Sequence, residues 1–433
     1  MFTFSNPYLK ISSILLLCIS FVLFLSLSIV SLQSINYSIN LFGGIIISCI
    51  GSYLFIKSNN FDNTRSSYIV LILLGLGIRL AVAIQPKATI DMSTWGIMAD
   101  AVLNQGNFYE SGRIKWPPYW PWFLGILKYS SNYIKLPFYF LVRLSLLIND
   151  LLIILFLNKI LMLKGLRQVY NLKILALYFL NPLVVIITVY HPQFGSIVFT
   201  FLLAAYYFGQ IGRNNIHSTL LAIGTAIKHI SGPALISFFI YSKSKKYWLI
   251  MPLLLITFFF LPILPYYLDN PESIKNSVFS YTSRAGYFGI WSTLADFNSE
   301  YFQSIMSFKI LFVLITFVGC LGIVIFARKK GKSLIEAIQL SFLTFHILTP
   351  GWAIQYQFWL IPFGVLCLNT KTQLILFSII GSLAYSEYFY GDWPVNPQIF
   401  LPFQYGIIIW WLLSLLFPKS LEEDDSAEVR VNL

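Results

Sequence analysis

The segment "IDMSTW" places a carboxylate, Asp91, a few residues beyond the apolar run "SYIVLILLGLGIRLAVAI". A carboxylate at this point can act as a general base, because it can take the proton from a hydroxyl group that attacks a substrate. It can also be the N-cap of the next helix, where it would accept hydrogen bonds from free backbone N–H groups and favour the helix dipole. The residue alone fits both roles.

The sequence "KHISGP", residues 228–233, breaks an apolar run with a glycine and a proline and places Lys228 and His229 at the break. A cation held there suits an anionic group such as the phosphate of a lipid headgroup. The alternative is a lysine whose ammonium group reaches the membrane surface. The turn "HPQFGS" adds His191 and Gln193, which can cap a helix or contact a ligand.

Three ionisable residues lie inside or at the end of apolar runs, where an unpaired charge is costly. Arg143 and Asp150 stand two helical turns apart in "YFLVRLSLLINDLLIIL" and therefore share one face. Arg79 lies near the end of the preceding run. We predict that these three form a structural ion network.

Two aromatic segments can bind a sugar or anchor the chain at the headgroup boundary. In "WPPYWPW", Tyr119 and Trp120 can stack on a sugar ring or belong to an interfacial girdle, and its prolines are predicted to prevent a regular helix. The segment "YTSRAGYFGIW" offers Tyr281, Arg284 and Trp291 for sugar or phosphate contacts, or as a lid packed on the membrane surface.

The composition predicts the surroundings of these residues. Of the 433 residues, 57% are hydrophobic and 11% are charged, whereas a soluble domain has about 25% charged residues. Runs of about 17 to 25 apolar residues, long enough to cross a bilayer as helices, recur along the chain. The net charge of +12 is spread over short loops, which is typical of orientation signals and argues against a nucleic-acid partner.

We therefore predict an all-α polytopic membrane protein with about 12–14 transmembrane helices and the lipid bilayer as a partner. The predicted spans are 11–33, 39–57, 67–85, 137–158, 173–190, 195–209, 216–228, 231–242, 247–266, 307–327, 333–349, 356–368, 372–388 and 400–417. Cytoplasmic N- and C-termini put every strongly basic loop inside. The run 216–241 must then return to its own side as a helical hairpin broken at residues 228–233.

The order of these motifs resembles the GT-C superfamily of membrane glycosyltransferases: an acid in the first large outer loop, "WPPYWPW", "VRLSLLIND", "HPQFGS" and "IKHIS". Within it, the chain is most similar to the dolichyl- or polyprenyl-phosphate-sugar-dependent glucosyl- and mannosyltransferases. The likeness covers about residues 67–240, with weaker agreement in "TPGWAIQYQFWLIPF". A histidine-glutamate-lysine motif of the eukaryotic glucosyltransferases is replaced here by "PGWAIQYQF", which has no acid or base.

The apolar runs and loops divide the chain into two N-terminal helices and a basic loop in 1–66, a core in 67–266 with a first outer loop at 86–136, a second outer loop at 267–306, C-terminal helices in 307–417 and an acidic cytoplasmic tail in 418–433. The resemblance implies that the core is catalytic. It implies a polyprenyl-phosphate-sugar donor and a glycan or glycolipid acceptor, reached from outside. A bacterial inner membrane is preferred because no endoplasmic-reticulum retrieval signal is evident.

The resemblance assigns the general base to Asp91 and the donor phosphate to Lys228 and His229, with His191 and Gln193 in the histidine-glutamine turn. Arg284 is a further candidate for the phosphate. One base and one cation suffice for a displacement with inversion, and no metal or cofactor is expected. Two alternatives are a flippase of lipid-linked sugars, which lacks support from an internal repeat, and a surface polysaccharide polymerase or ligase that uses a lipid diphosphate.

Overall fold

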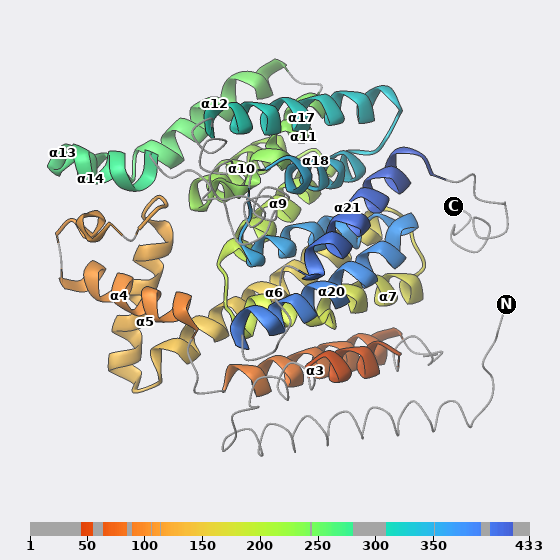
Figure 1. Cartoon of the computed structure of the whole chain (residues 1–433), viewed down its shortest axis with the longest axis horizontal. Coiled ribbons are helices and arrows are strands. Elements are labelled where there is room, and N and C mark those ends of the chain that lie inside the picture. Colours follow the sequence, from red (N-terminus) through yellow and green to blue (C-terminus); the bar gives the residue numbers. More distant parts are fainter. Residues whose placement is uncertain are drawn as a thin grey trace. The chain divides into compact units, whose positions relative to one another are not determined.

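A computed structural model describes residues 45–54, 64–84, 89–104, 106–112, 114–242, 245–279, 309–349, 351–390 and 399–418. All regular elements in these ranges are helices, in agreement with the predicted all-α class (Figure 1). The predicted first span, the sites on Tyr281, Arg284 and Trp291, and the acidic tail beyond Pro418 lie outside the described residues.

The chain divides into two compact units that alternate along the sequence. The first combines Met1–Val82, Leu157–Ile187 and Leu360–Leu433, and the second combines Ala83–Phe156 and Thr188–Trp359. The second unit contains Asp91, Lys228 and the turn at residues 191–196, so it holds the predicted catalytic groups.

The first unit is built from helices, one pair of which is bent at a proline. Its helices are α3 (Thr64–Ala83), the end of α6 (Phe138–Leu163), α7 (Gln168–Phe179), α8 (Pro182–Val185), α19 (Ile361–Gly364), α20 (Lys371–Tyr390) and α21 (Phe400–Leu416). The predicted span 173–190 is in fact α7 followed by residues 182–190, bent by 47° at Asn181 and Pro182. Proline ends a helix because it lacks the backbone N–H and its ring clashes with the preceding turn. Asn181 then caps α8 by accepting from the N–H groups of Leu183 and Val184 at 3.0 and 3.4 Å.

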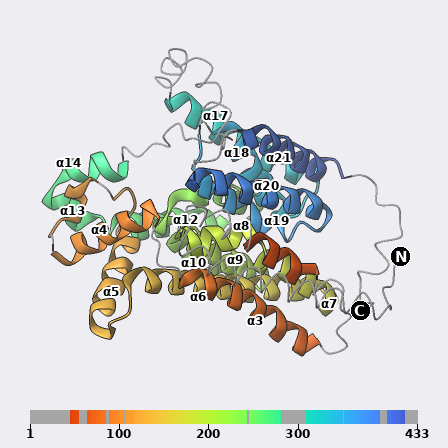
Figure 2. The same cartoon turned by 60° about the horizontal axis from the view of Figure 1, so that its bottom comes forward.

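The second unit has two groups of packed helices. Its main elements are the start of α6, α4 (Ile90–Asn104), α5 (Tyr119–Ile134), α9 (Gly195–Gln210), α10 (Asn214–Ile227), α11 (Gly232–Tyr241), α12 (Lys245–Phe260), α17 (Lys309–Lys329) and α18 (Leu334–Leu348). α4 packs along α5, as Figures 1 and 2 both show. α10 packs on α9 and α12, while α11 packs on α17 and α18.

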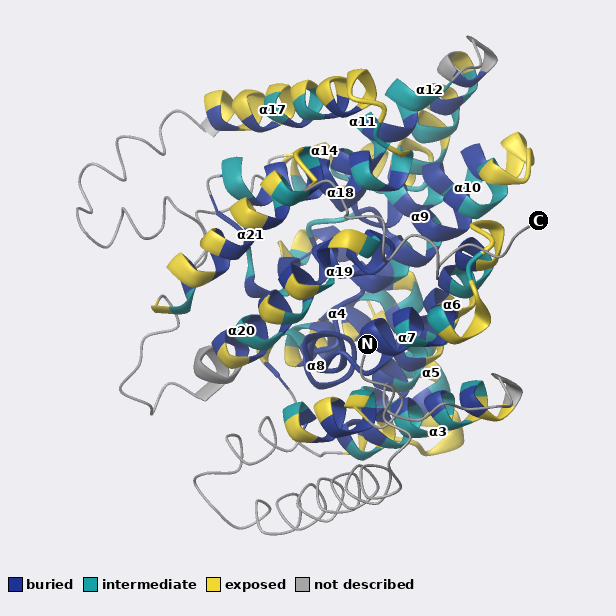
Figure 3. Cartoon of the chain, turned by 90° about the vertical axis from the view of Figure 1, so that its right-hand side faces the viewer, coloured by how far each residue is buried: buried dark blue, intermediate teal, exposed yellow. Residues whose placement is uncertain are grey.

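Three helices in the described residues are long and apolar enough to cross a membrane, at Ser66–Ala83, Phe138–Leu163 and Ile310–Lys329, or four if the bent pair at 168–190 counts as one span. One side of α17 is exposed along its length (Figure 3). Large apolar residues such as Ile310 (78% exposed) and Val318 (62%) cover it. Such a continuous apolar face is typical of a surface that meets lipid or another protein. The total of 12–14 spans stays a prediction.

The predicted break at residues 228–233 is confirmed. α10 ends at Ile227, Lys228 is extended, a 3₁₀ turn covers His229–Ser231, and α11 begins at Gly232 with a proline in its first turn. The ring of Phe238, late in α11, lies 5.3 Å from the ring of His217, early in α10. The chain therefore returns to the side from which it came, as the predicted hairpin requires.

Two predicted element boundaries are wrong. The prolines of "WPPYWPW" do not prevent a helix, because α5 begins at Tyr119 with Pro118 as its N-cap and Pro121 in its first turn. A proline is tolerated there, since the N–H groups of the first turn have no partner inside the helix. The predicted span 356–368 is instead a 3₁₀ helix, η5 (Ile354–Leu360), followed by the single turn of α19.

We expect Asn181→Ala to lower the free energy of unfolding by about 1–3 kcal/mol, because it removes the cap of α8 and a buried hydrogen bond of 2.8 Å to Ser378 Oγ. Thermal unfolding of the purified protein in detergent measures the change. Ser378→Ala is the matched control, since it removes the side-chain bond and keeps the cap, and it should cost less. An equal loss in both variants would show that the cap contributes nothing.

Candidate functional site

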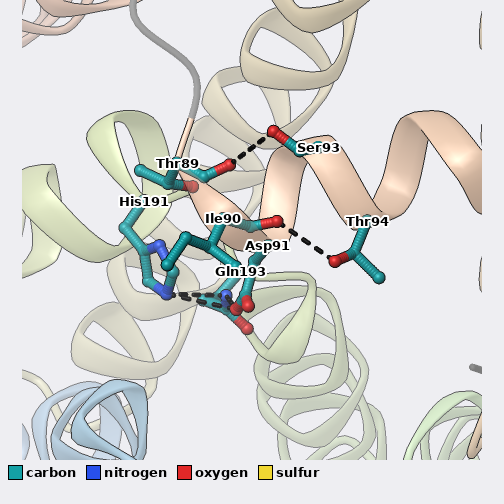
Figure 4. A network of polar contacts seen from close by, with 7 residues as sticks. All are labelled: Thr89, Ile90, Asp91, Ser93, Thr94, His191 and Gln193. Carbon is teal, nitrogen blue, oxygen red and sulfur yellow. Dashed lines mark hydrogen bonds and ion pairs between the residues drawn. The ribbon is translucent and has the colours of Figure 1, made fainter.

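Asp91 is the second residue of α4 and not its N-cap, because the helix begins at Ile90. The capping interpretation is therefore wrong, although a carboxylate in a first turn still favours the helix dipole. The helix buries one face, with Met92, Trp95 and Met98, and exposes Ser93 and Asp100. Asp91 projects away from its own backbone towards the turn that carries His191 and Gln193 (Figure 4).

The "HPQFGS" turn supplies the partners of Asp91. Gln193 Nε2 donates to Asp91 Oδ2 at 2.6 Å, and His191 Nε2 lies 3.2 Å from the same oxygen. The two donors also lie 3.0 Å from each other. The turn follows a π-helical segment that ends at Tyr190 and precedes α9, and both side chains are buried. Both residues thus contact Asp91, and their predicted contact with a substrate stays a prediction.

The environment of Asp91 keeps its carboxyl group ionised. Burial raises its pKa, but the hydrogen bond and charge of His191, the hydrogen bond of Gln193 and the charge of Lys228 outweigh that effect, and the net pKa lies below the ordinary value. The side chain is still 40% exposed, so it is open on one side. Oδ1 has no hydrogen-bond partner among the described residues. Asp91 thus presents an ionised oxygen that can accept a proton.

Lys228 supplies the opposite charge. Its backbone is extended, with φ −160° and ψ 130°, and its side chain is only 6% exposed. The ammonium nitrogen lies 4.5 Å from the ring centre of Phe194 and 5.8 Å from that of Trp116. These distances fit cation–π contacts. Within the described part of the chain, the ammonium group makes no hydrogen bond, so its three donors remain available to a ligand.

Stacked rings hold this cation in place. Phe194 lies parallel to Trp120, with centroids 4.8 Å apart and planes 10° apart, and Trp95 and Trp116 meet it edge to face. Trp120 is buried behind Phe194 and does not reach the cavity described next. The structure gives Trp120 a packing role, and its predicted sugar contact or place in an interfacial girdle stays a prediction.

Asp91 and Lys228 line one cavity of about 210 Å³. Pockets for drug-sized ligands are usually about 300–1,000 Å³, so this space suits one small group such as a single sugar ring or a phosphate. The other lining residues come from α4, from the two loops and from the segment after α18: Thr94, Trp95, Met98, Trp116, Gln193, Phe194, Ala353, Gln355 and Tyr356. All of them belong to the second unit.

The sequence prediction missed Gln355 and Tyr356, which η5 contributes to the cavity. The signal was present in "PGWAIQYQF", where the chain departs from the charged motif of the glucosyltransferases it resembles. The segment is fixed by His346 on α18, whose Nε2 lies 3.1 Å from the carbonyl oxygen of Tyr356. Neutral groups therefore occupy this wall, and they can recognise hydroxyl groups.

Several predicted site residues lie elsewhere. His229 is exposed and is not among the residues that line the cavity, so its predicted role beside Lys228 at a phosphate stays a prediction. Tyr119 donates its hydroxyl hydrogen to the carbonyl oxygen of Phe258 at 2.9 Å and ties α5 to α12. Its predicted sugar contact is not supported by this placement.

The residues of the predicted ion network have polar partners of other kinds. In the first unit, Arg79 donates to the carbonyl oxygen of Phe179 at 2.6 Å and stacks over its ring. In the second unit, Arg143 donates to the carbonyl oxygen of Ala83 at 3.1 Å, and Asp150 accepts from the hydroxyl of Thr188 at 2.7 Å. Direct ion pairing of these residues stays a prediction.

Comparison of the chain with protein-family models, with curated proteins and with solved structures finds no match. The site is therefore interpreted from its own chemistry. Within the described residues, no group of three or more His, Cys, Asp or Glu side chains is arranged to hold a metal ion. What the site offers is an ionised base, an ammonium group and an aromatic wall around a small space.

We expect Phe194→Ala to lower the free energy of unfolding by about 3–5 kcal/mol, because it empties the centre of the aromatic stack. Thermal unfolding in detergent measures the loss. Tyr133→Ala on α5 is the control, since Tyr133 is 81% exposed and its removal should change stability by less than about 0.5 kcal/mol. Equal stability of the two variants would contradict a buried role for Phe194.

Proposed function

We propose that this chain is a polytopic membrane glycosyltransferase that moves a hexose from a polyprenyl-phosphate donor to a hydroxyl of a glycan or glycolipid on the extracytoplasmic side, with inversion. The observation that carries the proposal is the cavity shared by Asp91 and Lys228. It combines a base with a free oxygen and a buried ammonium group with free donors, which are the two groups that such a displacement needs.

Asp91 and Lys228 act on opposite ends of the reaction. Oδ1 of Asp91 takes the proton of the acceptor hydroxyl as its oxygen forms a bond to the anomeric carbon. The bond from that carbon to the phosphate oxygen breaks, and the lipid phosphate leaves with the electron pair. Lys228 stabilises the charge that develops on the phosphate, and the reaction consumes no metal and no nucleotide. Attack opposite the leaving group inverts the anomeric configuration.

A lipid-linked donor fits this chain better than a soluble one. The apolar face of α17 and the candidate spans support a bilayer around the protein. The short basic loops offer no glycine-rich phosphate motif for a nucleotide sugar. The order of motifs that resembles the GT-C superfamily supports the same class of donor.

We expect Asp91→Asn to reduce transfer by about 10²–10⁴-fold while donor binding persists, because the amide has nearly the shape of the carboxylate but cannot take a proton. The measurement uses purified wild type and variant in detergent, a panel of polyprenyl-phosphate hexoses and membrane lipid extract as acceptor. NMR of the product gives its anomeric configuration, which should be opposite to that of the donor.

The outcomes separate the alternatives. Equal transfer by wild type and Asp91→Asn would remove Asp91 from the chemistry. Transfer only from lipid diphosphates would indicate a polysaccharide polymerase or ligase. Donor translocation across vesicles in the absence of transfer would indicate a flippase and would refute the proposed activity.

We expect Lys228→Met to lower kcat/KM by about 10²–10³-fold, because methionine preserves the apolar stem but removes the cation that faces the phosphate. Lys128→Met is the control. Lys128 lies outside the cavity in an ion pair with Asp100, of a kind worth about 0–1 kcal/mol, so transfer should be unchanged. A similar loss of activity in both variants would deny Lys228 a specific role.

A further inference from the structure

We propose that His191 and Gln193 are positioning residues that hold one oxygen of Asp91, Oδ2, so that the other, Oδ1, is the atom that takes the acceptor's proton. The inference rests on the proposed function, and it assigns to both residues a role other than the substrate contact predicted for them. Its basis is the geometry of Figure 4, in which both side chains converge on Asp91.

Both contacts fall on the same carboxylate oxygen. Gln193 Nε2 lies 2.6 Å from Oδ2 and His191 Nε2 lies 3.2 Å from it. The torsion that rotates a carboxylate about its last bond is broad, so an unrestrained Asp91 would exchange its two oxygens. Donors on one oxygen stop this exchange. They also draw charge to Oδ2, which leaves Oδ1 as the oxygen that is free to bind a proton.

Gln193 is the constant partner, and His191 can adapt. A neutral amide always presents N–H donors, so its bond to Oδ2 does not depend on pH. His191 Nε2 lies 3.0 Å from Gln193 Nε2 as well as 3.2 Å from Oδ2. When this nitrogen carries a proton it donates to Asp91, and when it does not it accepts from Gln193. Both side chains therefore hold Oδ2, and His191 lowers the pKa of Asp91 more than Gln193 does.

The turn can impose this geometry because it is itself fixed. Ser196 donates its backbone N–H and its hydroxyl to the carbonyl oxygen of Gln193, at 3.3 and 3.2 Å. Both His191 and Gln193 are only 4% exposed, and Phe194 beside them is locked by the aromatic stack. Asp91 sits on a different element, α4, so the contact joins two separately placed parts of the second unit.

The proposal predicts a change in pH dependence. The titratable groups that face Asp91 from the surrounding elements, within the described residues, are His191, Lys228 and the phenol of Tyr356. The hydrogen bonds to Asp91 hold its pKa below the ordinary value. Their removal raises the pKa, so the carboxylate is protonated at higher pH. The acidic limb of the kcat/KM profile must then move to higher pH.

The test compares Gln193→Met, His191→Gln and the control Ser93→Ala. Methionine keeps the length of the side chain but removes the donor, and we expect kcat/KM to fall about 10- to 100-fold with the acidic limb moved to higher pH. Glutamine at 191 retains a neutral donor, so the effect should be smaller. Ser93 lies exposed on the same helix, and within the described ranges its hydroxyl donates to the carbonyl oxygen of Thr89 and makes no contact with Asp91, so the Ser93→Ala profile should match wild type.

A second readout does not need activity. In protein labelled with ¹³C at the aspartate carboxyl carbon, the Asp91 resonance is identified by its loss in Asp91→Asn, and its pH titration gives the pKa directly. A higher pKa in Gln193→Met than in wild type supports the positioning role, even if no sugar donor is ever found to react. An unchanged pKa and an unchanged acidic limb would overturn it, even if the wild type transfers sugar as proposed.

Folding is checked in each variant by gel filtration and thermal unfolding. If Gln193→Met unfolds, His191→Gln and the shorter Gln193→Asn, which preserves an amide with reduced reach, take its place in both titrations. A Gln193→Asn profile identical to wild type would also contradict the proposal, because the shorter side chain cannot keep a 2.6 Å bond from an unmoved backbone.

Discussion

Keeping a carboxylate charged inside an apolar helical protein is the constraint on which this structure depends. Burial disfavours the ionised form of Asp91, and donors must replace the water that it loses. α4 cannot supply them, because Asp91 points away from its own first turn. The chain supplies them from a turn one hundred residues later, and that turn must be held between a π-helical segment and α9 for the contact to form.

Lys228 is also a buried charge, but among the described residues it is stabilised by aromatic rings and not by hydrogen bonds. A direct ion pair between Asp91 and Lys228 would have satisfied both charges and left neither free for a substrate. Instead the carboxylate is met by hydrogen-bond donors, while the ammonium group lies against the rings of Phe194 and Trp116, which attract it but take none of its protons. The break after α10 makes this possible, since an extended residue between two helices can aim a long side chain into the cavity.

Much of this was predictable from local sequence, and the failures have physical causes. Apolar runs predicted the helices, and a glycine and proline predicted the break at 228–233, because both signals act within one or two turns. The expectation that proline prevents a helix failed at Pro121, because a proline in the first turn of a helix is tolerated. The partners of Asp91 were not predictable, since a carboxylate that caps a helix and one that contacts a distant turn have the same local sequence. The segment "PGWAIQYQF" departs from the charged motif of the family it resembles, but that departure alone did not indicate which of its side chains reach the cavity.

The cavity that Asp91 and Lys228 share is small because packed side chains fill the space around them, and its size affects whether water can reach a bound donor. Aromatic rings from Trp95, Trp116, Phe194 and Tyr356 make up much of its lining, and the space of about 210 Å³ holds one small group. A sugar phosphate ester that loses its leaving group reacts readily with water, and only exclusion of water makes an alcohol the preferred nucleophile. For the proposed transfer, a wide cleft with the same two charges would let water compete with the acceptor. The aromatic stack around Lys228 keeps the cavity small, and this favours transfer to an alcohol over hydrolysis.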